Sequence, residues 1–348
     1  MKKLSVATIL LCLLACGSVF VPSCRKKDGK NEPTPRSFSI PQGFPSDLSI
    51  FDNNPLTNEG FELGRRLFYD GRLSKDGNFP CASCHQQFAA FATFDHSLSH
   101  GFNNSFTNRN APGLFNLAWH SEFHWDGGIN HLEVQPLAPI TAPNEMAEEI
   151  DNIIRKLEAD PTYPEQFRAA FGTPEINSQR MLKAITQFVA SLVSADSKYD
   201  RVMRGSDAFT PVEQQGYVLF KANCASCHKE PLFTDLSYRN TGLPVNPYIN
   251  DFGRMNITRN PADSLKFKVP SLRNVAVTFP YGHDGRFLTM ERVIEHYMNT
   301  VIPSPTLDPL LQNGIPLTNG EKDAIVAFLK TLTDENFLKD PRFAQPTD

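Results

Sequence analysis

The chain has 348 residues, enough for two domains that each bury a hydrophobic core. Its formal net charge of −4 is small, which argues against nucleic acid or an anionic surface as a partner. Phenylalanine and proline, at 27 residues each, are frequent, as expected for aromatic pocket walls and long irregular loops.

The N-terminus has the pattern of an export signal, which we place at residues 1–24. Two lysines precede an apolar run over residues 4–21. The run is long enough to span a bilayer, so an uncleaved membrane anchor is the alternative. Small or aliphatic residues precede both Cys16 and Cys24, which predicts a lipoprotein. We favour a lipid anchor at Cys24, with Cys16 as the alternative, because a polar, proline-containing linker (residues 25–36) follows.

Two copies of the motif Cys-x-x-Cys-His follow the linker. Their residues are Cys81, Cys84 and His85, then Cys224, Cys227 and His228. The motif is the covalent attachment site of c-type haem: its thiols bind the haem vinyl groups and its histidine binds the iron. Redox or zinc-binding cysteine pairs are the alternative, but a histidine follows each pair directly. Covalent haem attachment takes place outside the bacterial inner membrane, so the motifs and the export signal together predict a periplasmic protein with two haems.

The sequence around these motifs is repeated. Gly-x-x-Leu-Phe at residues 64–68 precedes the first motif and recurs at residues 216–220 before the second. After the motifs, Ala-Ile-x-x-Phe at residues 184–188 recurs at residues 324–328. The haem motifs and these helical segments have almost the same offset, which indicates a duplicated unit.

A capping box predicts where one of the repeated helices begins. Thr210 and Glu213 have the required spacing, with proline at the first helical position. Long runs of alternating strand pattern are missing from the sequence. We therefore predict an all-α fold of two tandem cytochrome c-like domains with long loops, residues 37–204 and 205–348, each binding one covalent haem.

Several further segments have the order and spacing of one known family. They are Ser99–Gly101, Arg109–Pro112, Phe123–Gly128, Leu132–Leu137, Phe267–Asn274 and Pro280–Arg286. Through them, residues 40–335 resemble the bacterial di-haem cytochrome c peroxidase family, which includes the methylamine-utilisation protein MauG.

The resemblance implies roles around the first haem. His100 falls on a distal histidine that is released on activation, Gln135 and Glu145 fall on the distal pocket pair, and Trp125 falls between the haems. A carboxylate near iron is suited to moving the proton that O–O cleavage requires. The alternatives are an acidic residue in the first turn of a helix at residues 144–157 for Glu145, and core packing for Trp125.

Other site residues follow from the same resemblance. Asn110, with the backbone carbonyls of Thr278 and Pro280, falls on a calcium site between the haems. Four more histidines after the first motif are candidate iron ligands, with a solvated or hydrogen-bonded side chain as the alternative for each. They are His96, His120, His124 and His131.

The second haem has three neighbouring candidates for its other axial ligand: His296, Tyr297 and Met298. Conventional peroxidases use methionine here, which raises the haem potential. On a helix that begins at Met290, however, the apolar positions 290, 293, 294 and 297 share one face. We therefore predict Tyr297 as the ligand, as in MauG, with Met298 as the alternative.

Three functions are compatible with these features, and from the sequence we favour the first, with the second as the alternative. The first is a peroxidase that reduces hydrogen peroxide to water at the N-terminal haem, with electrons from a small periplasmic cytochrome c or copper protein entering through the C-terminal haem. The second is a MauG-like enzyme that uses peroxide to oxidise a partner protein or small substrate through a high-valent di-haem state. The third is an electron-transfer cytochrome without enzymatic activity, in which Glu145 and Gln135 would have no role.

The partners remain less defined than the haems. Four lysines near the second motif suggest a docking face for a redox partner, with solvated side chains as the alternative. They are Lys221, Lys229, Lys266 and Lys268. No nucleic acid is expected, and the membrane contact is expected through the lipid anchor only. The sequence leaves the oligomeric state open, with a homodimer typical of conventional family members.

Overall fold

The computed structural model describes residues 32–347, which form one compact unit. The predicted export signal, both candidate lipidation cysteines and most of the linker lie outside the described residues. Between residues 32 and 347, no helix is long and apolar enough to cross a membrane.

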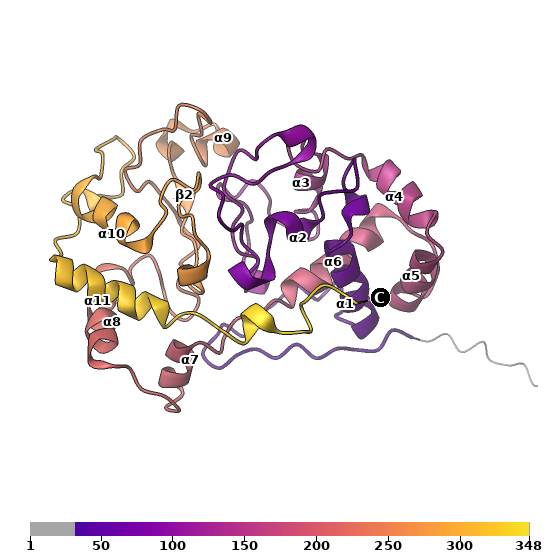
Figure 1. Cartoon of the computed structure of the whole chain (residues 1–348), viewed down its shortest axis with the longest axis horizontal. Helices are drawn as coiled ribbons and strands as arrows, with labels where there is room; N and C mark the ends of the chain where they lie inside the picture. Colours follow the sequence, from indigo (N-terminus) through magenta and orange to yellow (C-terminus); the bar gives the residue numbers. More distant parts are fainter. Residues whose placement is uncertain (1–31, 348) are drawn as a thin grey trace, which may run out of the picture. The chain divides into compact units, whose positions relative to one another are not determined.

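The described chain is mainly helical, with long loops between the helices (Figure 1). The helices are α1 (Asn58–Phe68), α2 (Cys81–Cys84), α3 (Leu137–Thr141), α4 (Ile150–Glu158), α5 (Thr162–Phe171), α6 (Ser178–Ala190), α7 (Lys198–Met203), α8 (Pro211–Asn223), α9 (Met255–Thr258), α10 (Met290–Asn299) and α11 (Asn319–Lys330). Two short strands, β1 (Tyr238–Arg239) and β2 (Phe267–Lys268), pair antiparallel. The predicted all-α class is confirmed in that the described residues are mostly helical with few strands.

The duplicated segments form two equivalent helix pairs. Helix α1 packs on α6, and α8 packs on α11. A glycine makes each close approach possible: a Cβ on Gly64 would lie 1.8 Å from the carbonyl oxygen of Ala184. The same construction gives 1.9 Å between Gly216 and the carbonyl oxygen of Ala324. The repeat in the sequence is therefore a repeated helix crossing in the structure.

Capping explains where the helices of the second pair begin. The Thr210 hydroxyl accepts from the backbone of Glu213, whose carboxylate accepts from the backbone of Thr210, as predicted. Thr318 and Glu321 make the same box at α11. Each box satisfies backbone N–H groups that lack a partner inside the helix.

Two hydrophobic clusters lie beside the two helix pairs. The first is rich in phenylalanine, including Phe68, Phe91 and Phe188. The second is centred on Phe220, Phe233 and Phe328. The chain after α11 returns to the first half (Figure 1), where Phe337 and Phe343 join the first cluster. The division into domains at residues 37–204 and 205–348 stays a prediction.

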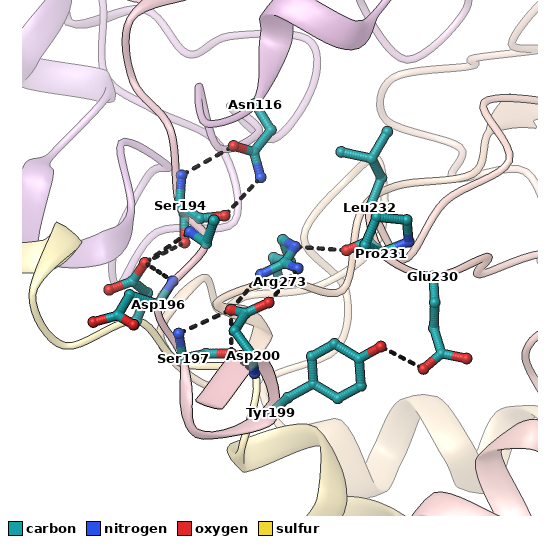
Figure 2. A network of polar contacts seen from close by, with 12 residues as sticks. Asn116, Ser194, Asp196, Ser197, Tyr199, Asp200, Glu230, Pro231, Leu232 and Arg273 are labelled. Atoms are coloured by element: carbon teal, nitrogen blue, oxygen red, sulfur yellow. Dashed lines mark hydrogen bonds and ion pairs between the residues drawn. The ribbon is translucent and has the colours of Figure 1, made fainter. Parts of the chain in front are cut away.

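A buried polar network holds the connection between the halves (Figure 2). Arg273, with a fully buried side chain, donates from two nitrogens to Asp200 at 2.8 and 2.9 Å. Its third nitrogen donates to the backbone oxygen of Pro231 at 2.7 Å. Nearby, Asn116 from the first half exchanges two hydrogen bonds with the backbone of Ser194, at 3.0 and 2.9 Å. These contacts connect segments that precede the second motif with segments that follow it.

Candidate active site

One continuous cavity of about 1200 Å³ is lined by both Cys-x-x-Cys-His motifs. Pockets for a single small ligand usually measure about 300–1000 Å³, so this cavity has room for more than one such group. All four motif cysteines are free thiols and line it. Within residues 32–347, no group of three or more His, Cys, Asp or Glu side chains is arranged to hold a metal ion.

The first motif presents its histidine to this cavity in a fixed orientation. The two cysteines begin and end the single turn α2, and the backbone N–H of His85 donates to the oxygen of Cys81 at 3.0 Å. The ring Nδ1 of His85 lies 2.7 Å from the carbonyl oxygen of Phe91, to which it donates. This bond leaves Nε2 unprotonated and available to iron, the arrangement expected of a metal-binding histidine.

The second motif has the same construction. The backbone N–H of His228 donates to the oxygen of Cys224 at 3.0 Å. Its ring Nδ1 lies 3.2 Å from two carbonyl oxygens, those of Phe233 and Pro270. The donor sets at both motifs therefore fit a covalently bound haem with a histidine ligand.

The two candidate proton-transfer and peroxide-binding residues lie on the side of the first motif. Glu145 and Gln135 both line the cavity, and burial raises the pKa of Glu145 above its usual value. Glu145 lies close enough to Cys84 for its charge to raise the pKa of that thiol. A carboxyl with a raised pKa holds a proton more readily than an exposed one, which suits it to proton transfer.

The expected helix at residues 144–157 is wrong at its start, because α4 begins only at Ile150. Residues 144–149 instead fold back onto α3: the N–H groups of Met146 and Glu148 donate to the oxygens of Pro139 and Ile140, at 3.1 and 2.8 Å. Ala147 has a positive φ of 54°, which ends any helical path. Glu145 therefore lies in a turn. The alternative explanation, that an acidic residue is favoured at this position by the dipole of a helix, does not apply.

His100 lies at the exposed edge of the same cavity. Its ring packs 4.6 Å from the ring of Phe106 and 5.1 Å from that of His96, between centroids. The structure thus brings His100 to the first motif, where its backbone oxygen lies 3.9 Å from the sulfur of Cys84. Ligation of iron by His100 stays a prediction.

Trp125 lies where the two halves meet. Its indole N–H donates to the backbone oxygen of Asn110 at 2.9 Å, and its own oxygen accepts from the N–H of Lys268 at 2.7 Å. The three predicted calcium ligands, Asn110, Thr278 and Pro280, also line the cavity. The amide nitrogen of Asn110 donates to Ser97, which leaves its oxygen free for a cation. Calcium itself stays a prediction.

The three ligand candidates on α10 occupy different environments. Tyr297 and His296 both line the cavity, whereas Met298 does not. Burial raises the pKa of Tyr297, with the thiols of the second motif adding to the effect. Met298 instead packs against the second hydrophobic cluster. Both ring nitrogens of His296 have partners, Thr300 at 2.9 Å and the oxygen of Thr241 at 2.8 Å. Of the three, Tyr297 is the side chain that faces the second motif.

One of the four lysines predicted to form a docking face does not lie on the surface. Lys268 is part-buried, donates to the backbone oxygen of Glu122 at 2.6 Å, and burial lowers its pKa to about 8. Lys221 pairs with Glu230 at 2.6 Å and Lys266 with Asp263 at 3.3 Å. The expectation was wrong for Lys268, because proximity in sequence to the motif does not place a side chain on the surface.

Sequence reasoning missed a charged cluster that joins the halves. Arg109 donates to Asp126 of the first half and to Asp251 of the second, each at 2.6 Å. The ring of Phe267 stacks on that of His283, with 3.7 Å between centroids. Arg109 lies in one of the recognised segments, but its partner Asp251 is 142 positions away, and no local pattern links them.

The site defines a class: a helical chain that presents two Cys-x-x-Cys-His turns to one cavity is built to hold two c-type haems. A family model described as di-haem cytochrome c peroxidase matches residues 58–208. The methylamine utilization protein MauG of Methylorubrum extorquens is 36% identical over 288 residues, which are 81% of this chain and 80% of that protein. Cytochrome c551 peroxidase of Nitrosomonas europaea is 37% identical over 280 residues, 79% and 80% of the two chains. The chain belongs to the di-haem cytochrome c peroxidase family and is an oxidoreductase.

Solved structures agree with this assignment. A MauG-like protein associated with microbial copper homeostasis is 36% identical, with a TM-score of 0.83 over 89% of this chain and 99% of that one. The diheme peroxidase BthA of Burkholderia thailandensis is 23% identical, with a TM-score of 0.72 over 84% of this chain and 91% of that one. The second similarity supports the fold alone.

Proposed function

We propose that the protein is a MauG-like enzyme, which takes oxidising equivalents from hydrogen peroxide and uses them to oxidise a partner protein or a small substrate. The observation that carries this proposal is the position of Tyr297, which faces the second motif while Met298 packs into the hydrophobic cluster. Bound haem would supply the redox-active iron at both motifs.

The nature of the axial ligand separates the candidate functions. A phenolate oxygen stabilises oxidised iron and lowers its potential, whereas a methionine sulfur raises the potential. A low-potential second site is a poor entry point for electrons from a donor protein. It is suited to holding an oxidising equivalent that a substrate later removes.

The residues at the first motif have proton-handling roles in this proposal. Glu145 takes a proton from one oxygen of hydrogen peroxide and returns it to the other oxygen, which leaves as water. Gln135 orients peroxide by hydrogen bonding. Trp125 is hydrogen-bonded to the backbone of both halves, and in this proposal it would lie between the two haems.

Reduction of peroxide to water with electrons from a small cytochrome c or copper protein is the second candidate. His100 favours it, because a distal histidine at the edge of the cavity, beside the first motif, would close that site at rest. The Nitrosomonas relative is named as a peroxidase of this kind. Both candidates consume peroxide at the first motif, and they differ in where the electrons come from.

The location and the remaining partners are part of the proposal. Covalent haem attachment and the apolar N-terminal run favour the periplasm, with a lipid anchor at Cys24, or at Cys16 as the alternative. Asn110, Thr278 and Pro280 would hold one calcium ion near the contact between the halves.

Electron paramagnetic resonance of the ferric and half-reduced protein tests the proposal. We expect a second haem with histidine and phenolate ligands, and a first haem that becomes high-spin and reacts with peroxide. A histidine–methionine signal would rule out the MauG-like function. Two low-spin haems in every redox state, with no peroxide consumption, would rule out both enzymatic functions.

A further inference from the structure

We propose that His124 is a positioning residue for peroxide, because it fixes the orientation of the Gln135 amide. The inference deepens the proposed function and rests on it. The sequence predicts His124 as a candidate iron ligand, whereas the structure places its ring within hydrogen-bonding distance of the Gln135 amide. Both side chains line the cavity of the first motif, together with Glu145.

The backbone of His124 is held in an unusual conformation. Its φ is +66°, in the left-handed region that residues other than glycine adopt at some energetic cost. A tight turn maintains it: the N–H of Gly127 donates to the oxygen of His124 at 3.4 Å, and Phe123 pairs with Ile129 at 2.7 Å. The turn directs the His124 ring to Gln135, where the ring Nε2 lies 3.3 Å from the amide nitrogen.

The chemistry of the two groups fixes their roles in this contact. An amide nitrogen can only donate, so the ring Nε2 of His124 accepts, and the ring proton is on Nδ1. Among residues 32–347, the side chain of Gln135 has no other hydrogen-bond partner. Its amide oxygen is therefore a free acceptor on a side chain that lines the cavity. An O–H group of hydrogen peroxide is the matching donor.

The contact depends on the protonation of His124. Burial lowers its pKa below 6.5; Arg109 and Lys268 act in the same direction, and Asp126 opposes them. These effects together favour the neutral form of the ring. Below its pKa, Nε2 carries a proton and donates, so the amide of Gln135 must turn its oxygen to His124. The amide NH₂ then faces the cavity, which changes the pocket from an acceptor to a donor.

This reversal predicts opposite pH effects for two ligands of the ferric first haem. Peroxide, which donates, is bound less well as the pH falls through the pKa of His124. Azide, an anionic acceptor, is bound more tightly. One hydrogen bond gained or lost corresponds to about a threefold to tenfold change in affinity. Azide binding is an equilibrium measurement that needs no turnover, so it separates this inference from the proposed function.

The experiment is a titration of the ferric holoprotein with azide between about pH 5 and 8, corrected for the protonation of azide itself. The variants are His124→Phe, Gln135→Leu and the matched control His131→Phe, an exposed histidine of the same segment. We expect tighter azide binding at low pH in the wild type and the control, and a flat profile in the other two.

Three results would overturn the inference. If azide binding to His124→Phe depends on pH as it does in the wild type, His124 does not control the orientation of Gln135. A wild-type profile in Gln135→Leu would show that the charge of the ring acts directly and not through the amide. Exclusion of azide at every pH from all variants would show that Gln135 does not face an open iron position. If the azide profiles hold while peroxide is not consumed, the proposed function fails and the orientation of Gln135 stands.

Discussion

Gly64 approaches the carbonyl oxygen of Ala184 so closely that a Cβ at position 64 would lie 1.8 Å from that oxygen. The obstacle is backbone, which cannot move aside without separating α1 from α6. We expect Gly64→Ala to lower the free energy of unfolding by about 1–3 kcal/mol, in spite of the higher helix propensity of alanine. Guanidinium unfolding followed by circular dichroism measures the change.

The duplicated structure supplies both a replicate and a control. Gly216→Ala should have a similar effect, because its Cβ would meet the carbonyl oxygen of Ala324. Gly320 lies near the start of α11 with nothing within 4 Å of its Cβ position, so Gly320→Ala should be neutral or stabilising by up to about 1 kcal/mol. Equal effects at positions 64 and 320 would contradict the close packing.

The pair of Arg273 and Asp200 predicts an acid-sensitive step in stability. Burial alone would raise the pKa of Asp200, but two hydrogen bonds from Arg273 outweigh it and hold that pKa below its usual value. A carboxyl with a depressed pKa in the folded state contributes stability above its unfolded pKa and loses it as the pH falls through the folded pKa. Asp200→Asn leaves Arg273 buried without a counterion, so we expect a loss of about 3–5 kcal/mol at pH 7.

Unfolding measured between about pH 7 and 3 tests this account. The difference between wild type and Asp200→Asn should shrink at the acid end, where the wild type also loses the carboxylate. Glu165→Gln is the matched control, since that carboxyl is exposed in its pair with Arg168 and should change stability by less than about 1 kcal/mol. A constant difference across the pH range would be evidence against the ion pair.

The α10 helix makes an equally direct prediction about the second haem. Tyr297→Phe removes the oxygen that faces the second motif, so the absorption and magnetic resonance signals of the second haem should change. Met298→Leu keeps volume and polarity within the hydrophobic cluster and should leave these signals unchanged. If instead Met298→Leu alters the second haem and Tyr297→Phe does not, methionine is the ligand and the MauG-like proposal fails.

Features that were predicted from the sequence are those encoded locally. Each haem motif spans five consecutive residues, and the capping box of α8 spans four. The residues that predict the inward face of α10 belong to a single helix. The repeat of residues 64–68 at 216–220 predicted the duplicated unit, and the structure shows that each copy carries the glycine that allows two helices to approach closely.

Features that were missed depend on tertiary contacts. The predicted start of α4 was wrong because residues 144–149 form hydrogen bonds with α3, and helix propensity does not reveal such tertiary contacts. Lys268 was expected on the surface, yet β2 carries it to Glu122 of the first half. The contact of His124 with Gln135 needs a left-handed turn at His124, and the sequence did not indicate that this histidine adopts it.

The role of Glu145 gives the sharpest test of peroxide chemistry. Glu145→Gln keeps the shape and hydrogen bonding of the side chain but cannot take up a proton, so both haems should remain attached while peroxide turnover falls about 10²- to 10⁴-fold. The pKa of Glu145 is raised by burial. Because the carboxylate is the active base, the wild-type rate should fall as the pH drops through that raised pKa. The rate of the variant should not show this decrease at low pH.

Glu149→Gln provides the control for this prediction. Glu149 belongs to the same acidic turn, but its side chain is exposed and makes no capping bond to α4. Turnover and its pH profile should therefore match the wild type. Stopped-flow measurement of peroxide consumption, with the absorption spectrum as a check on haem content, gives both quantities. Unchanged turnover in Glu145→Gln would remove this carboxyl from the mechanism and leave proton transfer to another group in the cavity.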